Sequence, residues 1–344
     1  MSSSRIDDRG IRSHSSSVAM AFMLGAGRTA RSPEEAAPFV VDRYILSVLL
    51  LCLIGAYLGQ AWNILMGFCG LLSLGHALYL GIGAYAAAAL YVKFGIGPWA
   101  GVFVAVALGV AAAFVIGWLG FRFRIEGVYF SLLTIAFAES ARIGFDNLAW
   151  LGGAAGFFLP VSAESAGQWH NLRGGPLFFY YLALIMAAGA LALSAALRSS
   201  KLGHAFLAIR EDAQAARALG VDVTRARFAA LFVSTAMTAV GGVFIAFWSN
   251  NLLPAQIFES SRSIDIILAP IVGGLGTLFG PIVGAFLLTP LGEALIGAMR
   301  AAGLDAPGAK ALVYGLMLMA IIAATPNGLW PWIARRLGLE GREP

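Results

Sequence analysis

Apolar residues in this chain come in long uninterrupted runs. Residues 44–92 contain no Asp, Glu, Lys or Arg, and five further runs are also uncharged: 94–121, 174–197, 228–258, 266–292 and 311–334. About 20 apolar residues in a helix span the roughly 30 Å hydrocarbon layer of a bilayer. The runs lack the ten-residue alternation that is typical of barrel strands. The pattern therefore predicts an all-α fold, that of a polytopic helical membrane protein.

Composition agrees with a chain surrounded by membrane lipid. Hydrophobic residues make up 59% of the 344 residues and charged residues 12%, whereas soluble domains contain about 25% charged residues. The net charge of +5 does not indicate a nucleic-acid partner, because the 23 Lys and Arg gather in a few short loops. Cys52 and Cys69 both lie in the first apolar run and lack the spacing of a metal site.

The positions of the basic residues predict the topology. Residues 121–124 and the loop 198–227, which holds six Lys/Arg against three Asp/Glu, are the most basic parts of the apolar region. The positive-inside rule assigns both to the cytoplasm. The chain crosses twice between them, so residues 145–176 form an external loop. Residues 1–43 are predicted to be a disordered cytoplasmic tail, 44–334 the transmembrane domain and 335–344 a cytoplasmic C-terminal tail.

The number of spans follows from these assignments. With a cytoplasmic tail, residues 44–92 have to cross an odd number of times, and the expected break lies within Gly67–Gly70 and at Gly75, Gly81 and Gly83. Residues 263–334 are expected to cross three times. The total is eight to ten transmembrane helices, with nine as the central value.

Two glycine-broken segments, near residues 70–84 and 273–285, stand in the two halves of the chain. Such paired interruptions point to a transport pathway, although glycines also allow close helix packing, and both explanations stay open. The residues expected near the pathway are Ser73, His76, Tyr79, Gly273, Gly274, Gly276, Thr277 and Gly280.

Chemistry for catalysis is missing from the sequence. The apolar runs hold almost no ionisable residues, and His76 is the only histidine clearly inside one. The chain contains no HExxH metal motif and no phosphate-binding Gly-x-x-x-x-Gly-Lys-Ser/Thr loop. We therefore expect no enzymatic activity and no cofactor, and we expect any energy source to lie on another polypeptide.

The cytoplasmic loop offers a surface for such a partner. Residues 204–219 are predicted to form one helix, and Gly220 to end it in a left-handed conformation. An apolar stripe runs along the helix and charged residues cover the opposite face. The stripe consists of Phe206, Ile209, Ala213 and Ala216, and the charged face of Arg210, Glu211, Asp212 and Arg217. Because the stripe is rich in alanine, it suits a protein groove better than a lipid surface.

At this loop the chain resembles a known family. The stretches Ala208–Asp212 and Ala215–Thr224 resemble the coupling region of permease subunits of branched-chain amino-acid ABC importers. Further stretches agree in order, and they are Gly70–Tyr85, Gly127–Glu139 and Ser263–Ala285. The resemblance covers roughly residues 45–325 and is greatest to LivM-type subunits.

The resemblance implies a permease of the bacterial inner membrane. Its expected partners are a second permease, giving a heterodimer, two cytoplasmic ATPase subunits and a periplasmic solute-binding protein. The implied solutes are branched-chain or other neutral amino acids, while urea, short amides and aromatic acids stay possible. The alternative is a self-powered secondary carrier or channel for a small solute such as urea or an amide.

Overall fold

The computed structural model describes residues 43–160, 171–301 and, further on, 308, 312, 314–316, 318–319, 323, 325–326 and 328–337. The N-terminal tail predicted for residues 1–43 lies outside the described residues except for Arg43. Residues 338–344 of the predicted C-terminal tail also lie outside them.

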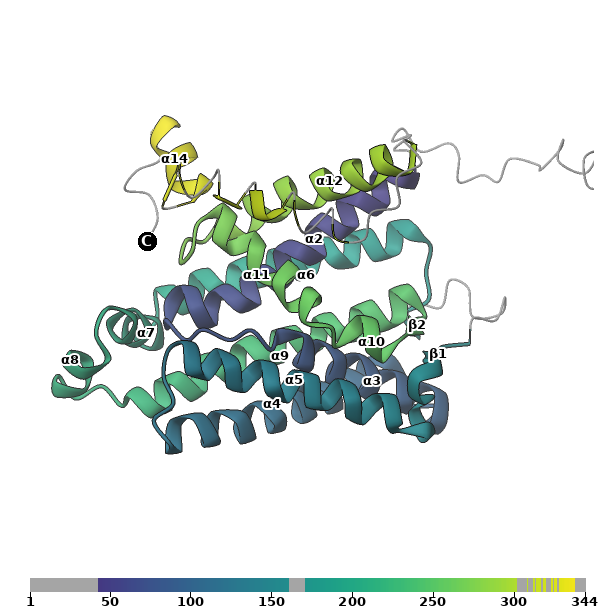
Figure 1. Ribbon diagram of the computed structural model, residues 1–344, viewed down its shortest axis with the longest axis horizontal. Helices are drawn as coiled ribbons and strands as arrows, with labels where there is room; N and C mark the ends of the chain where they lie inside the picture. The colour runs from purple at the N-terminus through teal and green to yellow at the C-terminus, as the bar shows by residue number, and fades with distance from the viewer. Residues whose placement is uncertain are drawn as a thin grey trace, which may run out of the picture. The chain divides into compact units, whose positions relative to one another are not determined.

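The described residues after position 42 form a helical bundle (Figure 1). The first half contains α2 (Arg43–Asn63), its π-helical continuation (Ile64–Phe68), α3 (His76–Phe94), α4 (Pro98–Arg122), α5 (Val128–Asn147) and α6 (Pro176–Arg198). The second half contains α7 (Lys201–Glu211), α8 (Ala213–Ala218), α9 (Val223–Ser249), α10 (Pro254–Ile257), α11 (Ser260–Gly273), α12 (Gly280–Ala301) and α14 (Leu329–Arg336).

Seven helices in the described part of the chain are long and apolar enough to cross a membrane. They are α2 with its π-helical turn, α3, α4, α5, α6, α9 and α12. This confirms the prediction of an all-α membrane protein. The total of eight to ten spans stays a prediction, because much of 302–327 is outside the described residues.

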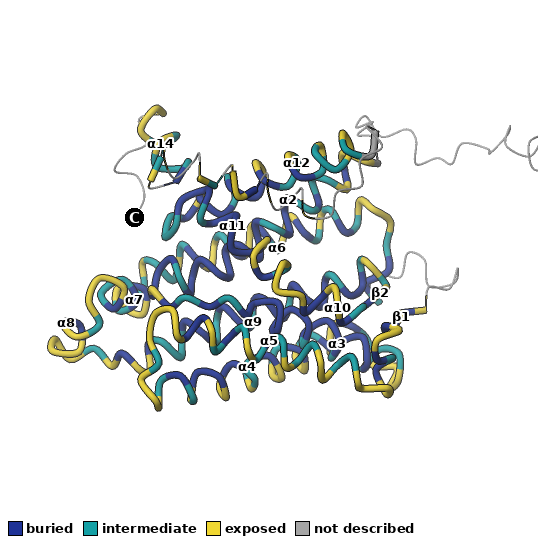
Figure 2. Tube along the Cα trace, in the orientation of Figure 1, coloured by how far each residue is buried: buried dark blue, intermediate teal, exposed yellow. Residues whose placement is uncertain are grey.

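Three helices occupy the centre of the bundle. In α2, α3 and α9, 61–67% of the most apolar window is buried, against 22–28% in the four other candidate spans. Figure 2 shows long buried stretches along these helices and exposed residues around α8. A side chain on Gly83 would overlap the backbone of α9, and one on Gly242 would overlap the backbone of α3. These glycines therefore let α3 and α9 approach closely.

This packing corrects the expected position of the break in the first apolar run. The helix does stop at Cys69, and residues 70–75 are not helical. Gly81 and Gly83, however, lie inside the continuous helix α3, where Gly81 packs against the ring of Phe258. The sequence pattern could not separate a glycine that interrupts a helix from one that admits a neighbouring helix.

The structure also corrects the crossing count of residues 44–92. Helix α2 lies antiparallel to α9: the Tyr57 hydroxyl donates to Met237 O (2.8 Å), and Leu50 shares a cavity with Trp248 near the end of α9. Helix α9 begins next to α8, so α2 begins at the opposite end of the bundle. The chain leaves that end through α2 and returns through α3, which gives an even number of crossings. The odd number rested on a cytoplasmic tail, and that tail lies outside the described residues.

The two ends of the bundle carry different elements (Figure 1). One end holds α7 and α8, and an ion pair joins both basic loops there, with Arg227 Nη1 2.7 Å from Glu126 Oε1. The other end holds a two-residue antiparallel pair, β1 (Phe157–Phe158) and β2 (Asn251–Leu252). At that end the buried Arg173 donates to Asn250 Oδ1 and to Pro160 O. The described C-terminal helix α14 also lies toward the first end: the Trp330 ring contacts Phe279, and Gly328 lies against Gly274 of the α11–α12 loop, whose Gly276 contacts Arg210 of α7.

Candidate coupling site and membrane cavity

The second glycine-broken segment is hydrogen-bonded to the end of α2. The Asn63 side chain donates from Nδ2 to Thr277 O (2.9 Å) and accepts at Oδ1 from Gly276 N (2.8 Å). The side-chain amide of Asn63 therefore makes two hydrogen bonds that connect the end of α2 to the loop between α11 and α12. The sequence singled out both segments but not Asn63, whose role depends on a contact 213 residues away.

The second segment is too tightly folded to hold side chains at its glycines. Gly273 ends α11, Gly280 begins α12, and a side chain on either would overlap backbone of the same loop. Gly274 and Gly276 have φ angles of 130° and 77°, which favour glycine. The Thr277 hydroxyl donates to Gly274 O and accepts from Gly280 N, so it fastens the loop internally.

Arg210 of α7 reaches this junction. Its guanidinium donates to Gly67 O at the π-helical end of α2. A side chain on Gly276 would overlap the same guanidinium, and one on Gly70 would lie 3.3 Å from Arg210 Cα. Arg210 therefore touches both glycine-broken segments. The sequence placed Arg210 on the charged face opposite the apolar stripe, and the residue is exposed there, but its guanidinium extends back to the end of α2, a contact that the sequence did not predict.

The loop helix is two helices instead of the single one predicted over 204–219. Asp212 has φ −156° and ψ 109°, and its carboxylate accepts from Gln214 N (2.7 Å) and Ala215 N (3.0 Å). These backbone N–H groups lower the pKa of Asp212 below its usual value. Aspartate at a helix start competes with continuation of the preceding helix, so α7 ends and α8 begins here. Gly220 has φ 88°, which confirms the predicted left-handed stop.

The predicted apolar stripe packs inside this chain. Phe206, Ile209 and Ala216 are buried and Ala213 is half-buried. The stripe therefore fits a groove of its own bundle, and a contact with another subunit would use the exposed face instead. That face contains Glu211, Asp212, Arg217 and Leu219, of which Leu219 was missed by the sequence analysis and is 85% exposed.

Ser73, His76 and Tyr79 lie in the interior between α3 and its neighbours. All three are fully buried, and His76 Nε2 lies 2.9 Å from Ser234 Oγ of α9. The hydroxyls of Ser73 and Tyr79 find no hydrogen-bond partner among the described residues. None of the three lines the cavity described below. Their predicted place along a pathway stays a prediction.

Side chains from distant parts of the chain accept hydrogen bonds from backbone N–H groups at the start of α3. Leu74 N donates to Thr134 Oγ1 of α5 (3.0 Å), and Ala77 N donates to Ser263 Oγ of α11 (2.9 Å). Backbone groups in the interior of a membrane protein need such partners, because lipid offers none. The non-helical segment before α3 is therefore held in the core by hydrogen bonds to α5 and α11.

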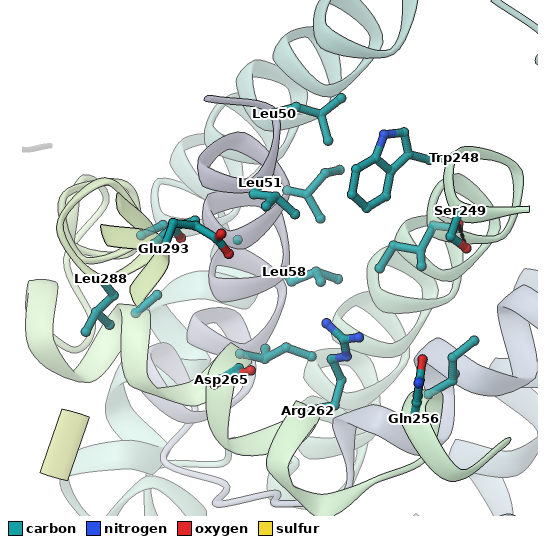
Figure 3. Close-up of a pocket in the computed structure, with 18 of the residues that line it drawn as sticks. Leu50, Leu51, Leu58, Trp248, Ser249, Gln256, Arg262, Asp265, Leu288 and Glu293 are labelled. Atoms are coloured by element: carbon teal, nitrogen blue, oxygen red, sulfur yellow. Dashed lines mark hydrogen bonds between the residues drawn. The ribbon is translucent and has the colours of Figure 1, made fainter. Parts of the chain in front are cut away.

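A cavity of about 270 Å³ lies in the half of the bundle away from α7 and α8. It lies over one face of α2, between the end of α9 and α12, and α10, α11 and Tyr314 complete its walls. Figure 3 shows the Arg262 guanidinium pointing into the space beside Leu58 and Trp248. Asp265 and Glu293 also line it.

Sequence reasoning did not find this cavity. Arg262 and Asp265 stand one helical turn apart just before the run 266–292, and Glu293 follows directly after it. Charges at the ends of an apolar run are ordinary in membrane proteins, so their position alone gave no signal. Folding brings the two ends of the run together because α11 and α12 form a hairpin around the glycine loop.

Comparisons with known proteins identify the family of this chain. Residues 44–322 match the profile of the family described as branched-chain amino acid transport system / permease component. The chain is 29% identical over 324 residues to the high-affinity branched-chain amino acid transport system permease protein LivM of Escherichia coli strain K12, and the match covers 88% of this chain and 74% of that protein. LivM of Salmonella typhimurium strain LT2 gives the same identity and coverage.

A second group of relatives matches a shorter part of the chain. The chain is 29% identical over 196 residues to the autoinducer 2 import system permease protein LsrC of Klebsiella pneumoniae, which covers 55% of this chain and 54% of that protein. No solved structure matches the chain significantly.

Proposed function

Because the chain belongs to the branched-chain amino acid transport permease family, we propose that it carries a branched-chain or other neutral amino acid into the cytoplasm, driven by ATP hydrolysed on partner subunits. The family consists of ABC-importer permeases, multi-pass membrane proteins that transport and do not catalyse. ATPase and binding-protein partners come with that family. What we propose for this chain is its solute, the identity of its partner subunits and its orientation in the membrane.

Amino acids are favoured as the solute by the extent of the similarity. The relatives named for branched-chain amino acid transport match 88% of this chain. The relatives named for autoinducer 2 import match 55–59%. Branched-chain or neutral amino acids are therefore the first solutes to test.

The observation that carries the coupling mechanism is the contact of Arg210 with both glycine-broken segments. An ATPase that moves α7 and α8 would pull on the end of α2 through Gly67 and on the α11–α12 loop beside Gly276. Asn63 joins the same two elements, so they would move together. In this mechanism, the exposed face of α7 and α8 contacts the ATPase, and the buried stripe holds both helices on the bundle.

Charge supports the proposed orientation and pairing. The basic loops containing Arg122 and Arg198 lie at the end with α7 and α8, which is the end expected in the cytoplasm. On α5, Arg142 pairs with Glu139 (2.5 Å) and Asp146 (3.1 Å), and these side chains are partly exposed within a candidate span. Charges facing lipid are costly, so this face of α5 is the proposed contact with the second permease.

Reconstitution tests the proposal. The chain, its partner permease and the ATPase subunits would be purified together, placed in liposomes and supplied with the binding protein. Uptake of radiolabelled leucine should require hydrolysable ATP and should be reduced by valine and isoleucine but not by urea or acetamide. Uptake by the permeases without ATPase subunits would instead support a self-powered carrier.

A further inference from the structure

We infer that the cavity between α2, α9, α11 and α12 is a binding site for the zwitterionic form of an aliphatic amino acid. The inference rests on the proposed function and adds a solute site within the permease itself. The cavity is lined by residues of five helices together with Asn251 and Tyr314. Its two sides differ in chemistry, and each matches one part of such a solute.

The apolar side fits an aliphatic side chain. It is formed by α2 and the end of α9, and its members are Leu50, Leu51, Ile54, Leu58, Ile245 and Trp248. Burial of a leucine-sized side chain against such a wall contributes through the removal of apolar surface from water. A volume of about 270 Å³ is at the small end for ligand pockets and suits a single amino acid.

The polar side carries both signs of charge. Arg262 on α11 is half-buried, and its guanidinium points into the cavity (Figure 3). A planar guanidinium matches a carboxylate in a two-bond geometry. Glu293 on α12 is also half-buried and can accept from an ammonium group. An amino acid is a small solute that presents a carboxylate and an ammonium next to an aliphatic chain.

The position of the charges strengthens this reading. Charges at the ends of an apolar run are ordinary in membrane proteins, but the side chains of Arg262 and Glu293 line one cavity instead of pointing into separate loops. Arg262 and Glu293 flank the uncharged run 266–292 and come together only through the α11–α12 hairpin. An uncharged, hydroxyl-rich solute would leave both charges unpaired and would not use the apolar wall.

The site lies at the entrance half of the proposed path. It is at the end of the bundle opposite α7 and α8, where β1 and β2 lie. A solute released at that end would meet the cavity before the glycine-broken segments near Arg210. The cavity therefore acts as an intermediate site between delivery and passage.

Direct binding tests the inference. The complete importer would be placed in lipid nanodiscs without added binding protein, and binding of radiolabelled leucine would be measured by scintillation proximity. Leucinol lacks the carboxylate and isocaproate lacks the ammonium, so both should compete poorly. Arg262→Gln should weaken leucine binding roughly 10- to 100-fold, the effect of losing one charge-assisted hydrogen bond, and Arg262→Lys should weaken it less.

Filling the cavity gives an independent variant. Leu51→Trp should abolish binding by occupying the apolar side, whereas Leu108→Trp on the exposed face of α4 should not change it. Normal leucine binding in both Arg262→Gln and Leu51→Trp would overturn the inference, as would a phospholipid that copurifies in the cavity and is not displaced by leucine. Uptake in liposomes separates the two proposals: ATP-independent uptake with normal leucine binding contradicts only the proposed function.

Discussion

Replacing Arg210 by alanine should uncouple ATP hydrolysis from transport. The guanidinium donates to Gly67 O and contacts the loop beside Gly276, so the variant removes the only side-chain hydrogen bond described between α7 and the π-helical turn. A hydrogen bond to a charged group contributes about 1.5–3 kcal/mol. Because Arg210 is exposed to solvent, the lower value of about 1.5 kcal/mol applies, and it corresponds to about a tenfold change in an equilibrium.

The assay is the ratio of leucine taken up to ATP hydrolysed in proteoliposomes. Arg210→Ala should lower this ratio about tenfold while binding-protein docking and ATP binding stay normal. Arg210→Lys should recover part of it, because an ammonium can donate to Gly67 O but cannot span both segments. Arg225→Ala is the matched control, since Arg225 is 89% exposed and pairs only with Asp222 in its own turn among the described contacts. An unchanged ratio in Arg210→Ala, or an equal loss in Arg225→Ala, would refute the reasoning.

Three further changes test the packing of the bundle and the loop. Gly242→Leu should lower the melting temperature of the detergent-solubilised protein because the new side chain overlaps α3, whereas Gly189→Leu, which faces open space, should leave it unchanged. Ala216→Trp should detach α8 and increase its cleavage by a soluble protease, while Ala215→Trp at an exposed position should not. The low pKa of Asp212 means that its cap is fully formed above the usual carboxyl pKa and is lost as pH falls through the lower folded value. The protection factors of α8 amides, which are corrected for the intrinsic pH dependence of exchange, should therefore fall at acid pH in the wild type and show no such fall in Asp212→Asn.

Much of the fold was predictable because its signals are local. Charge-free runs located the candidate spans within a few residues, as the run 174–197 and helix α6 illustrate. Gly220 was predictable because a left-handed helix end has a strong residue preference. Asp212 carried an equally local signal, its preference for helix starts, but helix propensity on both sides outweighed it in the sequence reading.

The remaining features depend on tertiary contacts. Gly83 looks the same in sequence whether it breaks a helix or admits α9, and only packing decides between the two. Asn63 and Arg210 acquire their roles from partners 213 and 143 residues away. The cavity is assembled from walls that no single segment contains. A periodic pattern predicts which face of a helix is apolar but not which neighbour covers it.

The hydrogen bonds at the start of α3 join parts of the chain that the ribosome makes at different times. Ala77 N is satisfied by Ser263 Oγ, which is made 186 residues later, and Leu74 N by Thr134 Oγ1, made 60 residues later. At about 5–20 residues per second, the ribosome reaches Ser263 about 10–40 s after Ala77. During that interval the entry to α3 has to keep its backbone groups hydrated or held by another protein. The start of α3 therefore completes these two hydrogen bonds only after α11 has been made, although α3 is among the first helices to be synthesised.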